Sequence, residues 1–564
     1  MTTFEWDKIA DVEAQENEND KEAFLTACVQ QLRRDKELYD AGSRDEVSDC
    51  AVNMPRPGGK LDKEQRTAHK LAFAMFPELG DPEDEKIKIW GIIQYSKMIS
   101  SLSAAVRERK SRQEEEKARP SKKVLRDRCL LRNREATDLP NAVTSPEPMP
   151  VQESPLSELQ PVIEALSSGQ PDFGDSDMVE YTRGVIFRDG RLDLCKQVLG
   201  TSHIAKVIDA MQGNTAVQHF LLGNNISGLP CAEAVSRHIK GGLPPHIKTW
   251  YLAGNCLDSD SISVLAEAFI IDTHASSLWL KRNHVGAAGA QALGRMLMVN
   301  TTLKTLDLLN TGLLDAGVIN LFSLLRDPQS VTGLRNLYLD GNGLTAECAP
   351  SIAGYFDDLV LQKKEGLFRI WLGMNRLGDE GATVILRSMK GYPYLQSVNL
   401  NSNRLTGACG KEIYETFKDH EGILALDVGC YKASIDLGME PNALHDEGAT
   451  SLAKLITENK SIRVLHVFEN EFTDEGLQEI ATALQENTQV LCLGYGQTGV
   501  RYNKDVMGNI TTSLKRNIAL DAEAAGLAEK EKSLKLLFRR IIHGDDIGNI
   551  DSIYRNRAMK EKEK

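Results

Sequence analysis

The chain has 564 residues, a formal net charge of −13 and an apolar fraction of 41%. This length exceeds what one ordinary globular core serves, so we expect several folded units or a repeat array. The negative charge argues against a general nucleic-acid-binding protein, because phosphate backbones attract basic surfaces.

Residues 1–136 are predicted to form a helical amino-terminal module. Apolar residues recur at helical spacing in 21–39, and two further apolar runs lie at 71–76 and 87–93. Residues 107–134 carry twelve Lys or Arg against five acids. The favoured interpretation is a solvated helix, and a nuclear-import or nucleic-acid patch is the alternative.

Residues 137–175 are predicted to be a Pro-rich linker. Six prolines stand between positions 138 and 161, among Ser, Glu and Thr. Such a composition buries too little apolar surface to fold alone.

Residues 176–216 are predicted to form an amino-terminal cap. Apolar residues flank Asp189 and Gly190, the turn pair of a two-residue hairpin, and a short helix follows near His203. A hairpin there would cover the open end of the repeat core that follows.

Residues 217–503 are predicted to be leucine-rich repeats. The clearest copies of the template LxxLxLxxNxL are 334–344, 367–377 and 395–405. Its Asn position is assigned to Asn225, Asn255, Asn283, Thr311, Asn342, Asn375, Asn403, Asn442, Asn470 and Gly496. The commonest spacing, 28 residues, fits one strand plus one full helix per repeat. We expect the Asn side chains to be framework, because they can satisfy backbone groups where each strand turns away.

These alternating units, with helix openings such as residues 375–382 (NRLGDEGA), resemble the ribonuclease-inhibitor-like leucine-rich repeat family. That family also includes Ran GTPase-activating proteins and the repeat domains of NOD-like receptors. The resemblance covers about 217–515 and implies an α/β horseshoe with a concave parallel sheet and convex helices. It also implies concave aromatic residues that face a ligand.

Residues 504–564 are predicted to be a C-terminal helical cap and tail. The segment 527–542 has Leu534, Leu537, Phe538 and Ile541 at helical spacing. We expect it to close the open end of the array.

The outward strand positions define the candidate binding surface. Position 5 of the template, read along the repeats, gives Leu221, Tyr251, Trp279, Asp307, Tyr338, Trp371, Asn399, Asp427, His466 and Cys492. Exposed aromatic rings beside basic side chains are typical of protein interfaces. The predicted partner-binding residues are Tyr251, Trp279, Lys281, Arg282, Arg335, Tyr338, Arg369 and Trp371. The alternatives are that the amino-terminal module or the linker covers these rings, or that they have no role.

Two further features stay open at this stage. Asp427, His466 and Cys492 are assigned to one column, which is the inventory of a Cys-His-Asp nucleophile or half of a metal site. The default interpretation is a solvated or partner-facing polar cluster. The insertion at 431–441 is either a recognition loop or a tolerated surface loop.

The sequence therefore predicts a non-enzymatic interaction scaffold with a protein partner of unknown identity. Self-association or intramolecular docking of the amino-terminal module is left open. The alternative is a GTPase-activating protein of the Ran type, with Arg376 and Arg404 at repeat edges. The ten cysteines form no CxxC pair, no stretch reaches the ~18 apolar residues of a membrane span, and no signal peptide begins the chain. We expect a cytoplasmic protein, with a nuclear location left open, and no metal, cofactor or membrane.

Overall fold

The computed structural model describes residues 152–169, 171–241, 246–430 and 440–554. Every described residue belongs to one compact unit, which lies within Lys122–Lys564. The predicted helical module of 1–136, the first part of the predicted linker and most of the insertion at 431–441 lie outside the described residues.

A single sheet runs through the described residues, with thirteen strands in chain order. The strands β1 (Met178–Glu180), β2 (Val185–Phe187) and β3 (Arg191–Asp193) pair antiparallel, and β2 and β3 form the hairpin expected around Asp189 and Gly190. From β3 onward every pair is parallel. The parallel strands are β4 (His219–Leu221), β5 (Thr249–Tyr251), β6 (Ser277–Trp279), β7 (Thr305–Asp307), β8 (Asn336–Tyr338), β9 (Arg369–Trp371), β10 (Ser397–Asn399), β11 (Ala425–Asp427), β12 (Val464–His466) and β13 (Cys492–Gly494).

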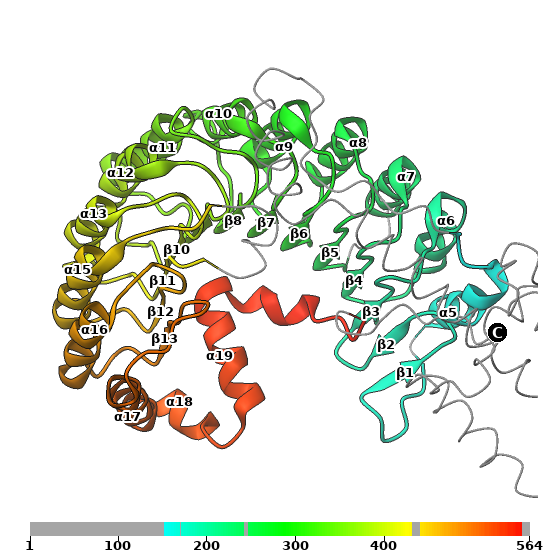
Figure 1. Cartoon of the computed structure of the whole chain (residues 1–564). Helices are drawn as coiled ribbons and strands as arrows, with labels where there is room; N and C mark the ends of the chain where they lie inside the picture. Colours follow the sequence, from blue (N-terminus) through cyan, green and yellow to red (C-terminus); the bar gives the residue numbers. More distant parts are fainter. Residues whose placement is uncertain (1–151, 170, 242–245, 431–439, 555–564) are drawn as a thin grey trace, which may run out of the picture. The chain divides into compact units, whose positions relative to one another are not determined.

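A helix of the outer layer follows each strand from β3 to β13 and packs on the helices of its neighbours. Figure 1 shows the strands on the inner side of an arc and these helices on its outer side. They are α6 (Gly200–Ala210), α7 (Gly228–Lys240), α8 (Ser259–Phe269), α9 (Gly286–Val299), α10 (Leu314–Leu325), α11 (Ala349–Gln362), α12 (Gly378–Met389), α13 (Gly407–Phe417), α15 (His445–Glu458), α16 (Asp474–Glu486) and α17 (Lys504–Leu520). One continuous apolar core fills the space between the two layers. The predicted α/β leucine-rich repeat solenoid is confirmed.

The linker prediction was wrong for residues that form the helix α5 (Leu156–Ser168). Its Leu159, Val162 and Leu166 are buried and pack with α6 in the main core. Asn214 Nδ2 donates a hydrogen bond to the Leu166 carbonyl over 2.9 Å. The prolines and polar residues of this stretch obscured an apolar face at helical spacing, and α5 covers the first repeat helix.

The Asn side chains form a ladder between repeats, as expected for framework residues. Asn342 Nδ2 donates to the carbonyls of Leu308 (2.8 Å) and Leu339 (3.0 Å). Its Oδ1 accepts from the backbone N–H groups of Thr311 (3.0 Å) and Leu313 (3.1 Å). Each such side chain therefore satisfies backbone groups of two consecutive repeats.

The last repeat was assigned with an error of two residues. Asp427 pairs with His466, and His466 pairs with Gly494. The template Asn position lies four residues after this column position, so Thr498 fills it in place of Gly496. Consequently Cys492 does not share the column of Asp427 and His466, because it pairs with Val464.

The predicted role of 527–542 as an end cap was also wrong. Helix α17 packs on α16, and its Val506 and Ile510 join the main core. The chain then continues through α18 (Ala522–Leu527), α19 (Glu531–His543) and the 3-10 helix η5 (Asp545–Ile550). Figure 1 shows α19 and the residues after it inside the hollow of the arc. Because α17 already closes the array, the apolar side of α19 is buried elsewhere, against Ala425, Val464 and Leu491.

Candidate protein-binding surface on the concave face

Four aromatic rings form what we call the aromatic column: Tyr251, Trp279, Tyr338 and Trp371. The parallel register aligns Tyr251 with Trp279, Trp279 with Asp307, Asp307 with Tyr338, and Tyr338 with Trp371. The small side chain of Asp307 lets the rings on either side of it approach to 5.4 Å between centroids. Tyr338 and Trp371 stack at 3.8 Å with 4° between their planes. The column forms an apolar cluster separate from the main core.

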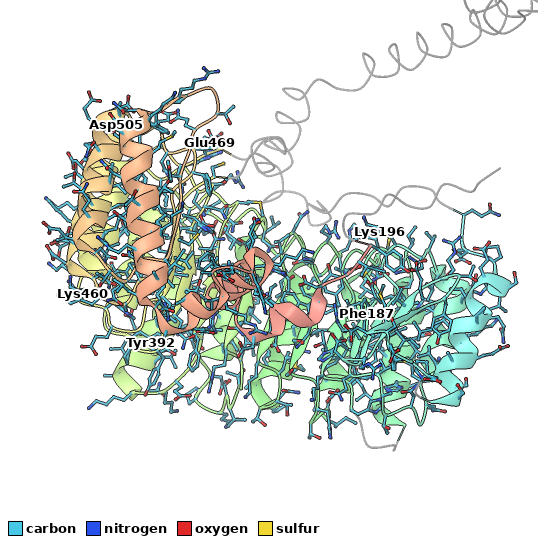
Figure 2. All side chains as sticks on the ribbon, turned by 90° about the horizontal axis from the view of Figure 1, so that it is seen from below. Phe187, Lys196, Tyr392, Lys460, Glu469 and Asp505 are labelled. Carbon is cyan, nitrogen blue, oxygen red and sulfur yellow. The ribbon has the colours of Figure 1, made fainter. Side chains whose placement is uncertain are left out.

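These rings are not exposed to solvent, contrary to the expectation from the sequence. Their exposed fractions are 7% for Tyr251, 1% for Trp279, 5% for Tyr338 and 1% for Trp371. Residues 531–554, which we call the C-terminal segment, cover them. Figure 2 shows this segment crossing from the side of the arc near Tyr392 toward the end that carries Phe187. The alternative left open by the sequence was cover by the amino-terminal module or the linker, whereas the residues that pack on the rings are Ile547 and Ile550 of the C-terminal segment.

His543, the last residue of α19, lies over the stacked pair in the column. Its ring is 5.3 Å from Trp371 with an interplanar angle of 10°, and 5.9 Å from Tyr338 with an angle of 12°. Its Nδ1 and the Tyr338 hydroxyl are 3.1 Å apart and share a hydrogen bond. The imidazole thus extends the aromatic stack outward from the sheet.

The turn after α19 covers the other half of the column. Ile547 and Ile550 are buried in the same cluster as Tyr251 and Trp279. Thr305 Oγ1 donates to Asp546 Oδ2 over 2.8 Å. The turn therefore combines an apolar contact with one polar anchor from β7.

The segment ends against strand β3. Ser552 Oγ donates to Asp193 Oδ1 over 3.0 Å, and the backbone N–H of Ile553 donates to Asp193 Oδ2 over 2.9 Å. Arg191 Nη1 donates to the Asp551 carbonyl over 2.5 Å. Sequence analysis identified the apolar side of α19 but missed His543, Ile547 and Ile550; the two isoleucines spaced three apart after Gly544 were the available signal.

The predicted basic residues do not form one group. Lys281 Nζ lies 4.0 Å from Asp307 Oδ2 and 5.4 Å from the centre of the Tyr251 ring, so it lies beside the column. Arg369 lies on β9 two residues before Trp371, and its Nε donates to the Ile541 carbonyl over 3.5 Å. Arg335 instead lies over the Phe368 ring and pairs with Glu365 at 3.1 Å. Arg282 has a positive φ of 59° in the turn after β6, and its buried Nε has no hydrogen-bond partner.

The polar cluster brings Asp427 and His466 together, with Cys492 beside them. His466 Nδ1 and Asp427 Oδ2 are 3.6 Å apart. Burial opposes the charge on His466, but hydrogen bonds to Asp427 and Cys492 outweigh it and raise the His466 pKa to about 10. Cys492 reaches the imidazole from two residues before the column position, where it also packs against the cluster under α19. In the described residues, no group of three or more His, Cys, Asp or Glu is placed to hold a metal ion.

Acidification is expected to weaken docking of the C-terminal segment through His543. Burial lowers the pKa of His543 to about 3, and Arg539, Lys281 and Arg369 act in the same direction against an opposing effect of Asp427. The contribution of His543 to docking is therefore full above its free pKa near 6.5 and falls as pH drops through that value. At pH 5 the loss reaches up to about 2 kcal/mol.

The control for this prediction is His543→Phe, which keeps a planar aromatic ring but has no group that titrates between pH 5 and 7.5. Burial raises the pKa of Asp546 and Asp193, and these carboxyls strengthen docking as pH falls, but they are common to both proteins. Hydrogen exchange of residues 531–554, corrected for intrinsic rates, should rise from pH 7.5 to pH 5 more in the wild type than in the variant. An identical pH dependence would contradict the role of His543.

Comparison with known proteins places these repeats among leucine-rich repeats. A family model described as Leucine Rich repeat matches residues 458–481. The chain is 28% identical over 310 residues to the ribonuclease inhibitor of Sus scrofa, covering 46% of this chain and 67% of that protein. It is 29% identical over 231 residues to NACHT, LRR and PYD domains-containing protein 12 of Homo sapiens, covering 40% of this chain and 20% of that protein.

Among solved structures, the leucine-rich repeat-containing protein LegL7 of Legionella pneumophila is 14% identical, with a TM-score of 0.32. This alignment covers 58% of this chain and 90% of that protein. Within the described residues, no helix combines the length and apolar character needed to cross a membrane.

Proposed function

Because its repeats are of the ribonuclease-inhibitor-like leucine-rich repeat type, we propose that this protein is an interaction scaffold that binds a protein partner on its concave face. The observation that carries the proposal is the aromatic column with Lys281 and Arg369 beside it. Four rings on β5, β6, β8 and β9, with Asp307 of β7 between them, form an apolar strip that a polypeptide segment covers. Large aromatic side chains with flanking cations are the composition of interface hot spots.

The alternative of a Ran-type GTPase-activating protein gains no support from the relatives described above. The two arginines noted at the repeat edges are engaged within the chain. Arg404 Nε pairs with Glu440 at 2.6 Å, and Arg376 Nη2 donates to the Gly343 carbonyl over 3.3 Å. Neither side chain projects freely as a residue that stabilises a transferring phosphoryl group would need to.

The test is face-dependent capture of a partner from native lysate. All proteins in this test are full-length and carry Ile547→Asp and Ile550→Asp, which are expected to uncover the column. The concave variant carries Lys281→Glu and Arg369→Glu in addition. The matched control adds Arg387→Glu and Lys411→Glu on α12 and α13 of the outer helical layer, where Arg387 pairs with Glu412. We expect a partner to be retained by the control at least tenfold more than by the concave variant, because only the concave variant reverses the two cations beside the aromatic column. Equal retention by both would contradict the proposal.

A further inference from the structure

The C-terminal segment occupies the concave face in the manner of a bound peptide. It offers an apolar helix side with Leu537 and Ile541, a planar ring at the helix end, and a turn with two isoleucines. We propose that residues 537–550 stand in for the docking segment of a partner protein, and that this partner presents a segment of the same chemistry and displaces them. The inference rests on the proposed function, since it specifies the kind of partner that the same face takes.

Gly544, which connects α19 to the 3-10 helix η5, determines the first part of the sequence pattern expected in a partner segment. Gly544 has φ of +83°, which a residue with a side chain rarely adopts, and a Cβ there would lie 3.3 Å from Arg369 Nη1. Arg369 donates a hydrogen bond to the carbonyl of Ile541, which lies in the last turn of α19, where carbonyl groups lack partners within the helix. The face thus recognises a helix whose last residue carries a planar ring and is followed by glycine.

The turn fixes the second part. Residues three apart in a 3-10 helix lie on the same side, so Ile547 and Ile550 both face the column. The carboxylate of Asp546, one residue before Ile547, accepts a hydrogen bond from the Thr305 hydroxyl. A matching partner segment therefore carries an acid and two branched aliphatic side chains within the seven residues that follow its glycine.

The docked segment leaves polar groups of the face unsatisfied. Among the described residues, the buried atoms Trp279 Nε1, Trp371 Nε1 and Asp340 Oδ2 have no hydrogen-bond partner. A buried polar group left unpaired costs about 1–3 kcal/mol. A partner that supplies acceptors to the indole N–H groups would bind more favourably per contact than the chain's own segment.

Covalent linkage gives the segment an advantage that a partner must overcome. A tethered segment acts at an effective concentration on the order of 1 mM, so it competes with any partner present at lower concentration. Binding in trans should consequently be weak for the wild type and strong once the segment is released.

The experiment measures binding of a fluorescent peptide of residues 531–554 to the full chain by anisotropy. The chain with Ile547→Asp and Ile550→Asp should bind it at least tenfold more tightly than the wild type. Peptides with His543→Gly or Ile547→Asp should each bind at least tenfold more weakly, and Lys535→Ala should bind unchanged, because Lys535 is mostly exposed and pairs only with Glu531. Equal affinity of both chains, or equal effects of all three peptide substitutions, would overturn the inference.

Two further measurements distinguish a partner protein from a second copy of this chain, and distinguish failure of this inference from failure of the proposed function. A concentration-dependent wild-type dimer in sedimentation, lost in the released variant, would assign the face to a second copy of this chain and overturn the partner. Failure of the peptide with successful face-dependent capture would overturn this inference and leave the proposed function intact. Peptide binding without face-dependent capture would overturn the proposed function and reduce the segment to an internal lock.

Discussion

Replacing Ile547 and Ile550 by aspartate is expected to free residues 531–554 from the concave face while the repeats stay folded. The two isoleucines are 7% and 1% exposed, and burying such side chains contributes about 1.5–3 kcal/mol each. Two carboxylates in their place would face the rings of the aromatic column, where an unpaired charge is strongly disfavoured. The docked state should therefore lose more than about 4 kcal/mol.

Hydrogen-exchange mass spectrometry measures this release directly. Amides of residues 531–554 should exchange as in an unstructured segment, while the strands β4–β13 stay protected. Acrylamide should also quench Trp279 and Trp371 more strongly, because only the segment shields them from solvent. Leu520→Asp with Val500→Asp is the control, since these side chains are 64% and 43% exposed. Continued protection of 531–554 in the isoleucine variant would show that the column does not hold the segment.

Replacing Asn342 by leucine is expected to destabilise the repeats around β8 by about 3–5 kcal/mol. The substitution removes the donors to Leu308 and Leu339 and the acceptor of Thr311 and Leu313, all of them buried backbone groups. No water can replace these bonds at a side chain that is fully buried. The side chains are close in volume, so lost hydrogen bonds and not a cavity should dominate.

The matched variant for this prediction is Asn342→Thr, because Thr311 fills the same position in the preceding repeat. There the threonine hydroxyl donates to the Leu308 carbonyl over 2.7 Å. We expect Asn342→Thr to lose less stability than Asn342→Leu, by about 1 kcal/mol, since it keeps one of the four bonds. Urea unfolding followed by circular dichroism, with hydrogen exchange of β8 and β9, measures both. Equal stability of Asn342→Leu and the wild type would show that the ladder is not framework.

The sequence by itself determined the repeats and the alignment of the column. A strand pairs with the next strand about 28 residues on, so a regular period and an Asn at each turn state which residues are neighbours. This reasoning correctly aligned Tyr251, Trp279, Tyr338 and Trp371 at one position of the sheet, with Asp307 between the two pairs. It failed at Cys492 because the last repeat has no Asn to mark its register, and at 156–168 because prolines disguised the apolar face of α5.

Only the tertiary structure decided what covers the column. The spacing of Leu534, Leu537, Phe538 and Ile541 shows that α19 needs an apolar surface, but the open end of the array and its concave face both offer one. The position of α19 depends on α17, which covers the open end of the array. It also depends on contacts between the C-terminal segment and residues far from it in the chain, such as Thr305 with Asp546 and Asp193 with Ser552. Contacts between positions more than two hundred residues apart leave no periodic trace in the sequence, whereas contacts between successive repeats do.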